Sequence, residues 1–438
     1  MNRIFYGMVV FAFAVAASRQ LVFDLAPWLP EDLPALFAVV PDGPEWKEPL
    51  AAMTDALFDM VKIAVMNVVL PLVGAMAFFL GLLKVAEKAG AMLFMAKLLR
   101  PLMVLLFPSV PPNHPAMSAM ILNIAANAFG LGNAATPFGL RAMQELDKLN
   151  GEKGTASDAM CLFLAINTSG VTLLATGVVA IRATFHSNDP AAVIPTTLFA
   201  TACSTVAAIT VAKLAERLSP GAPSVVDETV TDEASDAFPL WVSGLALVGL
   251  LALIPATLVW GSLFGKWIVP TMIIGFLTWG FVRGVPIYEA FVEGAREGWD
   301  TAVRIIPFLV AILGMVGLLR GAGAIDLFSA VVGPVTEPLG MPAEALPMAL
   351  LRPLSGSGAS GVMMSILTEH GPDSYVGYLV STMQGSTETT FYVLAVYFGS
   401  VGVKRVRHAM FAGIVADTVG VVAAIVAVSI YFTYKGLW

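Results

Sequence analysis

Charged residues and cysteines are scarce in this chain. Only 13% of its 438 residues are charged, whereas 58% are hydrophobic. Its two cysteines, Cys161 and Cys203, both lie inside apolar runs, which excludes a disulfide framework. The four histidines show no metal-ligand spacing, and the sequence has no G-x-x-x-x-G-K-[ST] loop and no nucleophile with a nearby base. We therefore expect no metal centre, no cofactor and no enzyme activity.

Long apolar segments dominate the rest of the chain. Runs of about twenty apolar residues recur from end to end, the length that crosses ~30 Å of hydrocarbon. Runs such as 242–259 and 268–282 are apolar on every side, whereas a transmembrane β-strand alternates apolar and polar residues. The sequence thus predicts a multi-pass helical protein of a lipid bilayer. The net charge of -7 comes mostly from two acidic stretches, and without a basic patch we expect no nucleic acid partner.

The first segment, residues 1–23, has two interpretations. Its basic start, apolar run and small residues are typical of a cleaved signal peptide. They also suit an uncleaved first span, which is the interpretation we prefer. Polar stretches follow at 24–49 and 216–237, where prolines and acidic residues predict loops or linkers.

Weak internal similarity divides the chain into two repeats. Pro71 in the first half matches Pro307 in the second, and the stretch Asn167-Thr-Ser-Gly-Val-Thr matches Gln384-Gly-Ser-Thr-Glu-Thr further along. Matches in a shared order are typical of transporters built from internal repeats. We predict an N-terminal span with an extracytoplasmic loop (1–55), repeat A (56–214), an acidic cytoplasmic linker (215–237), two connecting spans (238–284) and repeat B (285–433).

Positive charges predict opposite orientations for the two repeats. Lysine and arginine in short loops are retained on the cytoplasmic side of a membrane. The basic loop 404–407 of repeat B corresponds to a loop of repeat A that holds only Arg182. The basic stretch 84–100 of repeat A corresponds to a stretch of repeat B that holds only Arg320. We therefore expect inverted repeats in a bacterial cytoplasmic (inner) membrane, with a cytoplasmic N-terminus and an extracytoplasmic C-terminus.

Each repeat is expected to contain the same elements in the same order. The predicted fold class is all-α, with two inverted-topology repeats that contain broken helices and hairpin-like segments. In each repeat we expect a long span (56–83; 299–319), a hairpin-like region (84–112; 321–345), a broken helix (116–142; 346–368) and two more spans (158–181 and 191–213; 375–402 and 405–432).

Polar breaks interrupt the apolar sequence at matching places. Residues 123–139 contain three asparagines, three glycines and a proline, and residues 352–361 read Arg-Pro-Leu-Ser-Gly-Ser-Gly-Ala-Ser-Gly. An interrupted helix frees backbone N–H and C=O groups, which persist at membrane depth only inside protein or beside a wet cavity. Paired breaks therefore predict a binding site near the bilayer midplane. The structural alternative is that these small residues only let helices pack closely.

Charged residues inside apolar sequence extend this site. Glu388 and Asp417 are carboxylates whose ionised forms are costly in a membrane, so we expect them to face a cavity or partner and to carry any ion coupling. Arg352 is the natural counter-charge for Glu388 or for an anionic solute, and a purely structural ion pair is the alternative. The predicted substrate-binding residues are Asn123, Asn127, Gly130, Gly132, Asn133, Asn167, Thr168, Ser169, Thr172, Arg352, Ser355, Gly356, Ser357, Gly358, Gln384, Ser386, Thr387, Glu388 and Thr389.

Long motifs in both halves resemble a known family. The first half contains NIAANAFGLGNAATPFG (123–139) and AINTSGVTLL (165–174), which are similar to spore maturation protein A. The second half contains LRPLSGSGA (351–359) and QGSTETTFYVLAVYFGSVG (384–402), which are similar to spore maturation protein B. The chain therefore resembles a fusion of the two, within the nucleoside recognition (Gate) domain family.

This resemblance implies a membrane transporter or permease-like protein, without identifying its cargo. We predict that it moves a small polar or anionic solute through a midplane site between the repeats, with one repeat rocking against the other. The alternative is a non-transporting membrane scaffold or assembly partner in spore or envelope maturation. Homo-oligomerisation is compatible with both.

Overall fold

The computed structural model describes residues 2–25, 48–130, 132–219, 221 and 237–436. Every regular element in these ranges is a helix, as the sequence predicts, and one isolated β-bridge joins Thr155 to Arg405. Most of the predicted loop at 24–49 and most of the predicted linker at 216–237 lie outside the described residues.

The two repeats contain corresponding series of helices. Ser157 in repeat A and Ser374 in repeat B cap equivalent helices with their side-chain oxygens. Repeat A consists of α3 (Pro49–Ile63), a π-helical turn (Ala64–Val69), α4 (Leu70–Lys88), α5 (Ala91–Leu106), α6 (Pro115–Ala128), α7 (Gly132–Lys148), α8 (Asp158–Thr168), α9 (Thr176–Thr184), a 3₁₀ turn (Pro190–Val193) and α10 (Ile194–Leu218). Repeat B consists of α12 (Ile287–Gly321), α13 (Ala324–Thr336), two 3₁₀ turns (Glu337–Leu339 and Ala343–Ala345), α14 (Leu346–Leu351), α15 (Gly356–His370), α16 (Tyr375–Ser386), α17 (Thr390–Val393), a π-helical turn (Leu394–Phe398) and α18 (Ala409–Lys435). Outside the repeats lie α1 (Asn2–Leu25) and α11 (Leu240–Val282).

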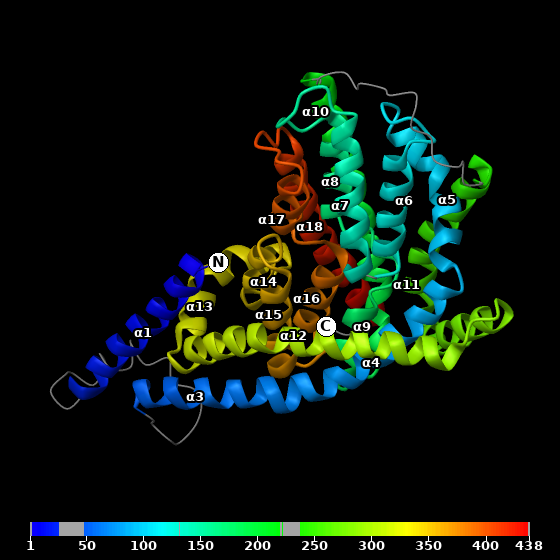
Figure 1. The fold of residues 1–438 in the computed structure, drawn as a ribbon. Helices are drawn as coiled ribbons and strands as arrows, with labels where there is room; N and C mark the ends of the chain where they lie inside the picture. Colours follow the sequence, from blue (N-terminus) through cyan, green and yellow to red (C-terminus); the bar gives the residue numbers. More distant parts are fainter. Residues whose placement is uncertain (1, 26–47, 131, 220, 222–236, 437–438) are drawn as a thin grey trace.

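The long helices of the two repeats pack against each other in opposite directions. Figure 1 shows α3 and α12 side by side across the lower part of the molecule. Glycines of α12 make the contact: a methyl group on Gly321 would lie 2.6 Å from Met53 Cα, and one on Gly298 would lie 2.6 Å from Ala77 Cα. Small residues permit such close helix packing in membranes. Because residue numbers rise along α12 as they fall along α3 and α4, these equivalent helices are antiparallel and the repeats are inverted.

The last helices of the repeats, α10 and α18, form the centre of the molecule. They are also antiparallel, because Arg407, before α18, donates to the carbonyl of Ser219, after α10. Between these ends, Ser204 donates to the Ala416 carbonyl at 2.8 Å. The helices α8 and α16 each pack against both α10 and α18. This core therefore belongs to both repeats, and neither repeat buries its apolar faces alone.

The segment 116–142 is a helical hairpin, so the prediction of a single broken helix there was wrong. α6 and α7 lie side by side, and Asn123 in α6 donates to the Ala135 carbonyl in α7 at 2.8 Å. Gly130, with a φ of 72°, lies where the chain reverses, in a conformation that glycine adopts at little cost.

The spans predicted as continuous over 158–181 and 375–402 are the helices that are broken. Residues 169–175 separate α8 from α9, and residues 387–389 separate α16 from α17. Local side-chain hydrogen bonds offer the backbone an alternative to the helix here, since Ser169 Oγ donates to the Ile166 carbonyl at 2.7 Å.

The helix α11 turns back on itself. It extends over 43 residues, yet the ring of Phe94 lies 5.7 Å from Phe238, just before the helix, and 5.7 Å from Trp279, near its end. A straight helix of this length would separate those two rings by about 60 Å. Its two arms therefore occupy the place of the two connecting spans predicted for 238–284.

Several helices of the described residues are long and apolar enough to cross a membrane. The bent pair Leu309–Gly321 and Ala324–Leu339, whose axes differ by 82°, would add a fifth crossing to the four that meet this criterion alone. The four are Tyr6–Leu25, Pro49–Lys88, Pro190–Leu218 and Ala409–Lys435.

Candidate functional site

The two broken helices meet at their interruptions. α8 and α16 approach each other with their C-terminal ends, and the Glu388 N–H donates to the Thr168 carbonyl at 2.9 Å. A methyl group on Gly170 would lie 2.9 Å from the Ser386 carbonyl oxygen. This backbone bond between repeats satisfies groups that a membrane would otherwise leave unpaired. We call residues 168–172 and 384–390 the junction.

The two sides of the junction reach this meeting point with different backbone conformations. In repeat A, Gly170 has a φ of 85° and Val171 a φ of 45°. Positive φ is rare for a β-branched residue and marks local strain, which collects at functional sites. In repeat B, Thr387 and Thr389 have φ values of -132° and -83°, which any residue adopts.

Arg352 holds the end of α16 in place. It is 4% exposed, and its Nη1 donates to Thr389 Oγ1 at 3.2 Å. Its Nη2 donates to the carbonyl of Gln384 at 3.1 Å and to the carbonyl of Thr387. The guanidinium thus satisfies carbonyls that the helix end leaves free. Nη2 also lies 3.8 Å from Glu388 Oε2, which is one of the two pairings that the sequence predicted.

Glu388 is the charged group that the junction presents outward. Its side chain is 45% exposed, in contrast to the buried Arg352. The polar residues Asn127, Thr172 and Gln384 are also only partly buried. A carboxylate at membrane depth needs water, a cavity or a ligand beside it. The exposed side of the junction is therefore negative and rich in hydrogen-bonding groups.

Amide side chains tie the broken helix of each repeat to a neighbouring helix, α6 in repeat A and α15 in repeat B. Asn127 in α6 donates to Asn167 Oδ1 in α8 at 3.0 Å, and Asn167 donates to the Phe163 carbonyl at 2.9 Å. In repeat B, Gln384 in α16 donates to Ser360 Oγ in α15 at 2.9 Å. The two halves of the junction thus use the same construction with different residues. Ser360 lies in the predicted break 352–361 but was not among the individually predicted binding residues.

Several predicted residues have mainly local partners. The hydroxyls of Thr168, Ser169, Thr172 and Ser386 donate to carbonyls two or three residues earlier in the chain. Asn123, which is fully buried, donates to the Tyr397 hydroxyl at 3.2 Å.

The glycine- and serine-rich stretch of repeat B lies against the junction. Ser355 caps α15 by accepting a hydrogen bond from the Gly358 N–H at 3.0 Å. A methyl group on Gly356 would lie 2.9 Å from Thr389 Oγ1, and Ser357 is partly buried. In repeat A, Gly132 begins α7, and the Asn133 side chain lies outside the described residues.

Asp417 contacts the junction through Thr390, which the sequence analysis did not single out. The Thr390 hydroxyl donates to Asp417 Oδ2 at 2.6 Å, and Asp417 is 5% exposed. In the described part of the chain, no three His, Cys, Asp or Glu side chains gather as metal ligands. The signal for Thr390 is its place beside Glu388 in the run Thr-Glu-Thr-Thr.

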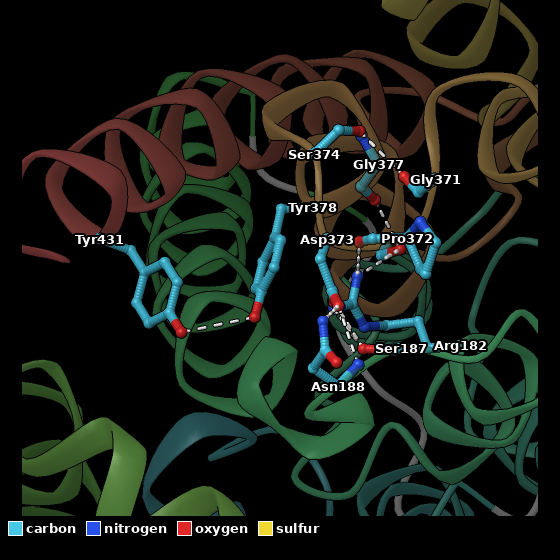
Figure 2. Close-up of polar contacts among 11 residues, drawn as sticks. Arg182, Ser187, Asn188, Gly371, Pro372, Asp373, Ser374, Gly377, Tyr378 and Tyr431 are labelled. Atoms are coloured by element: carbon cyan, nitrogen blue, oxygen red, sulfur yellow. Dashed lines mark hydrogen bonds and ion pairs between the residues drawn. The ribbon is translucent and has the colours of Figure 1, made fainter. Parts of the chain in front are cut away.

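A second polar cluster lies at one end of the core (Figure 2). Arg182, near the end of α9, is fully buried, and its Nη2 donates to Asp373 Oδ1 at 3.0 Å and to Ser187 Oγ at 3.2 Å. Its Nη1 donates to the Pro372 carbonyl at 2.5 Å, and its guanidinium carbon lies 4.1 Å from the centre of the Tyr378 ring. This cluster joins repeat A to the start of α16 in repeat B. The sequence placed Arg182 only as a loop cation.

A matching pair joins the repeats at the opposite end. Arg407, before α18, donates to Asp158 Oδ1 at 2.6 Å and to the Ala156 carbonyl at 3.1 Å. Arg407 is more open than Arg182, with an exposed fraction of 13% against 0%, whereas Asp158, at 20%, is less exposed than Asp373, at 32%. Burial, together with the charge of Arg407, lowers the pKa of His408. We call the pairs Arg182–Asp373 and Arg407–Asp158 the two end clamps.

Known proteins match both halves of this chain. A family model described as Gate, nucleoside recognition, matches residues 69–217 and 302–404, which is more than half of the chain. Spore maturation protein B of Bacillus subtilis (strain 168) is 46% identical over 164 residues, covering 37% of this chain and 92% of that protein. Spore maturation protein A of the same organism is 41% identical over 160 residues, covering 36% of this chain and 81% of that protein.

One solved structure aligns with almost the whole chain: CNTnw in an inward-facing substrate-bound state. The alignment covers 98% of this chain and 91% of that chain, with a TM-score of 0.45 and 13% sequence identity. The sequence matches confirm the family resemblance that the motifs of both halves indicated.

Proposed function

Because this chain belongs to the Gate, or nucleoside recognition, family, we propose that it is a membrane transporter for a small polar solute. The observation that carries the proposal is the junction, where two inverted helices are interrupted and share the Glu388 to Thr168 backbone bond beside a half-exposed carboxylate. Close packing of helices alone requires only small residues. It does not account for an exposed glutamate beside a buried arginine.

The charge of the junction favours an uncharged or cationic solute. The Nη groups of Arg352 are already bound to Thr389 and to backbone carbonyls, and the side chain is only 4% exposed, so the guanidinium is poorly placed to bind an anionic solute. Glu388 is the exposed charge, and a carboxylate accepts hydrogen bonds from hydroxyl or amine groups. Of the two solute classes predicted from the sequence, polar and anionic, the geometry supports the polar one.

We propose that the solute is carried by movement of the core, the helices α8, α10, α16 and α18, as one rigid body. Rocking of one repeat against the other would separate α10 from α18 and break both end clamps. Movement of the core, with α8, α10, α16 and α18 together, past the long helices α3, α4 and α12 would keep those contacts. We place the protein in the bacterial inner membrane with a cytoplasmic N-terminus, which reporter fusions to each terminus would check.

The test is uptake by reconstituted liposomes. The purified full chain is inserted into liposomes and exposed to a pool of uncharged, cationic and anionic metabolites, and the contents are identified by mass spectrometry. We expect uptake of at least one uncharged or cationic solute. Glu388→Gln should reduce this uptake at least tenfold, whereas Asp326→Asn, which changes an exposed carboxylate outside the junction, should leave it unchanged.

Two results would count against transport through the junction. The first is an Arg352→Leu variant with normal abundance and normal uptake. The second is a folded wild-type protein that takes up nothing from the pool. That second result would favour a scaffold role, which is all that the names of the spore maturation relatives require.

A further inference from the structure

One face of α18 is fitted closely to the junction around a single carboxylate. Gly413 and Gly420 flank Asp417 on this helix. A methyl group on Gly413 would lie 2.8 Å from Thr390 Cγ2, and one on Gly420 would lie 2.6 Å from Thr387 Cγ2. The glycines therefore let α18 approach residues 387–390 until the Asp417 carboxyl reaches the Thr390 hydroxyl.

The Asp417 carboxyl is only half satisfied in this position. Oδ2 accepts a hydrogen bond from the Thr390 hydroxyl at 2.6 Å, whereas Oδ1 is buried and has no hydrogen-bond partner among the described residues. The other charged side chains at the junction are Arg352 and Glu388, and neither forms an ion pair with Asp417 within the described residues. The other helices packed on this face contribute the uncharged Thr168 from α8 and Ser204 from α10.

An ionised carboxylate is poorly stabilised in such a place. Removing a charge from water costs several kcal/mol unless a counter-charge and hydrogen bonds replace the water. One hydroxyl replaces part of that solvation at Oδ2 and nothing replaces it at Oδ1. A bound metal cation would need several oxygen ligands around it. The glycine contacts leave α18 packed directly on the Thr387 and Thr390 side chains instead.

We propose that Asp417 is a proton-binding site that couples protonation to the position of the junction. In the described conformation a proton taken from water lies on Asp417, and it is released when residues 387–390 shift locally, while α16 and α18 stay packed together, so that water reaches the carboxyl. The link to solute movement rests on the proposed transport function. The protonation itself does not, because it follows from the surroundings of Asp417 alone.

The test reads the protonation state directly. Infrared difference spectra of the full chain in detergent, recorded across a pH series, show a carbonyl band for a protonated carboxyl and its loss on ionisation. We expect a band at neutral pH that is absent in Asp417→Asn and unchanged in the control Asp326→Asn. Thr390→Val removes the one donor to the ionised form, so the midpoint for loss of the band should move to higher pH by about one unit.

The outcomes separate this proposal from the transport proposal. A wild-type spectrum identical to that of Asp417→Asn would overturn the proton site, and so would a band that responds to sodium and not to pH. If the Asp417→Asn protein does not accumulate, the Thr390→Val variant decides instead: a carbonyl band lost at the same pH as in wild type would overturn the proton site. A normal band in a protein that takes up no solute would leave the proton site intact and refute the transport function.

Discussion

The two repeats form the two sides of the junction with different kinds of polar side chain, uncharged in repeat A and partly charged in repeat B. In repeat A the polar groups are amides and hydroxyls, with Val171 at the position that Glu388 occupies in repeat B. Thr201 occupies the position that Asp417 takes in repeat B, since Val206-Ala-Ala-Ile matches Val422-Ala-Ala-Ile 216 residues later, and Thr201 donates to the Ser169 carbonyl at 2.9 Å. Arg352, Glu388 and Asp417, the three charged groups that the described residues place at the junction, therefore all belong to repeat B.

This difference separates the requirements of fold from those of chemistry. Both copies need an interrupted helix whose freed backbone groups find partners, and both meet this need with small residues and hydrogen bonds from a neighbouring helix. Under the proposed transport function charge is needed only once, because a single carboxylate beside the solute is enough for recognition or coupling. The two repeats thus share the backbone arrangement of the junction, whereas its charged side chains come from repeat B.

The two end clamps give a second comparison, and substitutions there are expected to cause the largest loss of stability. Arg182 is fully buried, whereas Arg407 is partly exposed. Arg182→Met would leave the Pro372 carbonyl without its side-chain donor and Asp373 without its counter-charge, at a cost of about 3 kcal/mol in stability. Arg407→Met should cost less, about 1 kcal/mol, since the Arg407 side chain is already partly solvated.

Thermal unfolding of the purified variants in detergent would measure this difference. Arg182→Lys is the matched control, because it keeps the charge but loses the planar fork that reaches Asp373 and the Pro372 carbonyl together, so it should fall between wild type and Arg182→Met. Equal losses for Arg182→Met and Arg407→Met would show that the two clamps are energetically alike.

The close crossing at the junction should be sensitive on one side only. Gly170→Ala places a methyl group 2.9 Å from the Ser386 carbonyl in a left-handed conformation, which should cost about 2 kcal/mol and abolish uptake. Thr387→Ala alters the corresponding residue of repeat B, which has an ordinary φ of -132°, and should cost less than half as much. Unfolding midpoints of the two variants give the comparison, and a tolerated Gly170→Ala would refute the tight crossing.

The sequence predicts the position of the junction better than its shape. Charged residues inside apolar runs stand out because an unpartnered charge is costly in a membrane, and glycines stand out because they permit backbone conformations that other residues resist. Whether a glycine-rich stretch interrupts a helix or reverses it depends on tertiary contacts, such as the bond from Asn123 to Ala135, that leave no local signal. Arg182 was missed for the same reason, since its partner Asp373 lies 191 residues away.

Matching losses are expected where the repeats use the same construction. Asn127→Ala removes the bond to Asn167, and Ser360→Ala removes the bond from Gln384. Each variant should lose about 1 kcal/mol of stability, the usual worth of a hydrogen bond between neutral groups. Thermal unfolding of the single and double variants would check this, and a stability loss in the double variant much larger than the sum of the single losses would show that α6 and α15 stabilise each other through the junction.

The smallest expected effect is a dependence of stability on pH at the Arg407 clamp. His408 adjoins the Arg407 clamp, and burial lowers its pKa from the ordinary value of 6.5. Below pH 6.5 the unfolded chain therefore takes up a proton that the folded chain does not, so stability falls as the pH drops from 6.5 toward the folded pKa. Unfolding midpoints measured between neutral and mildly acidic pH should show this slope in wild type and a shallower one in His408→Asn, whose side chain does not titrate. Identical slopes would place the acid sensitivity elsewhere, because His408 then has the same proton affinity in the folded and unfolded chains.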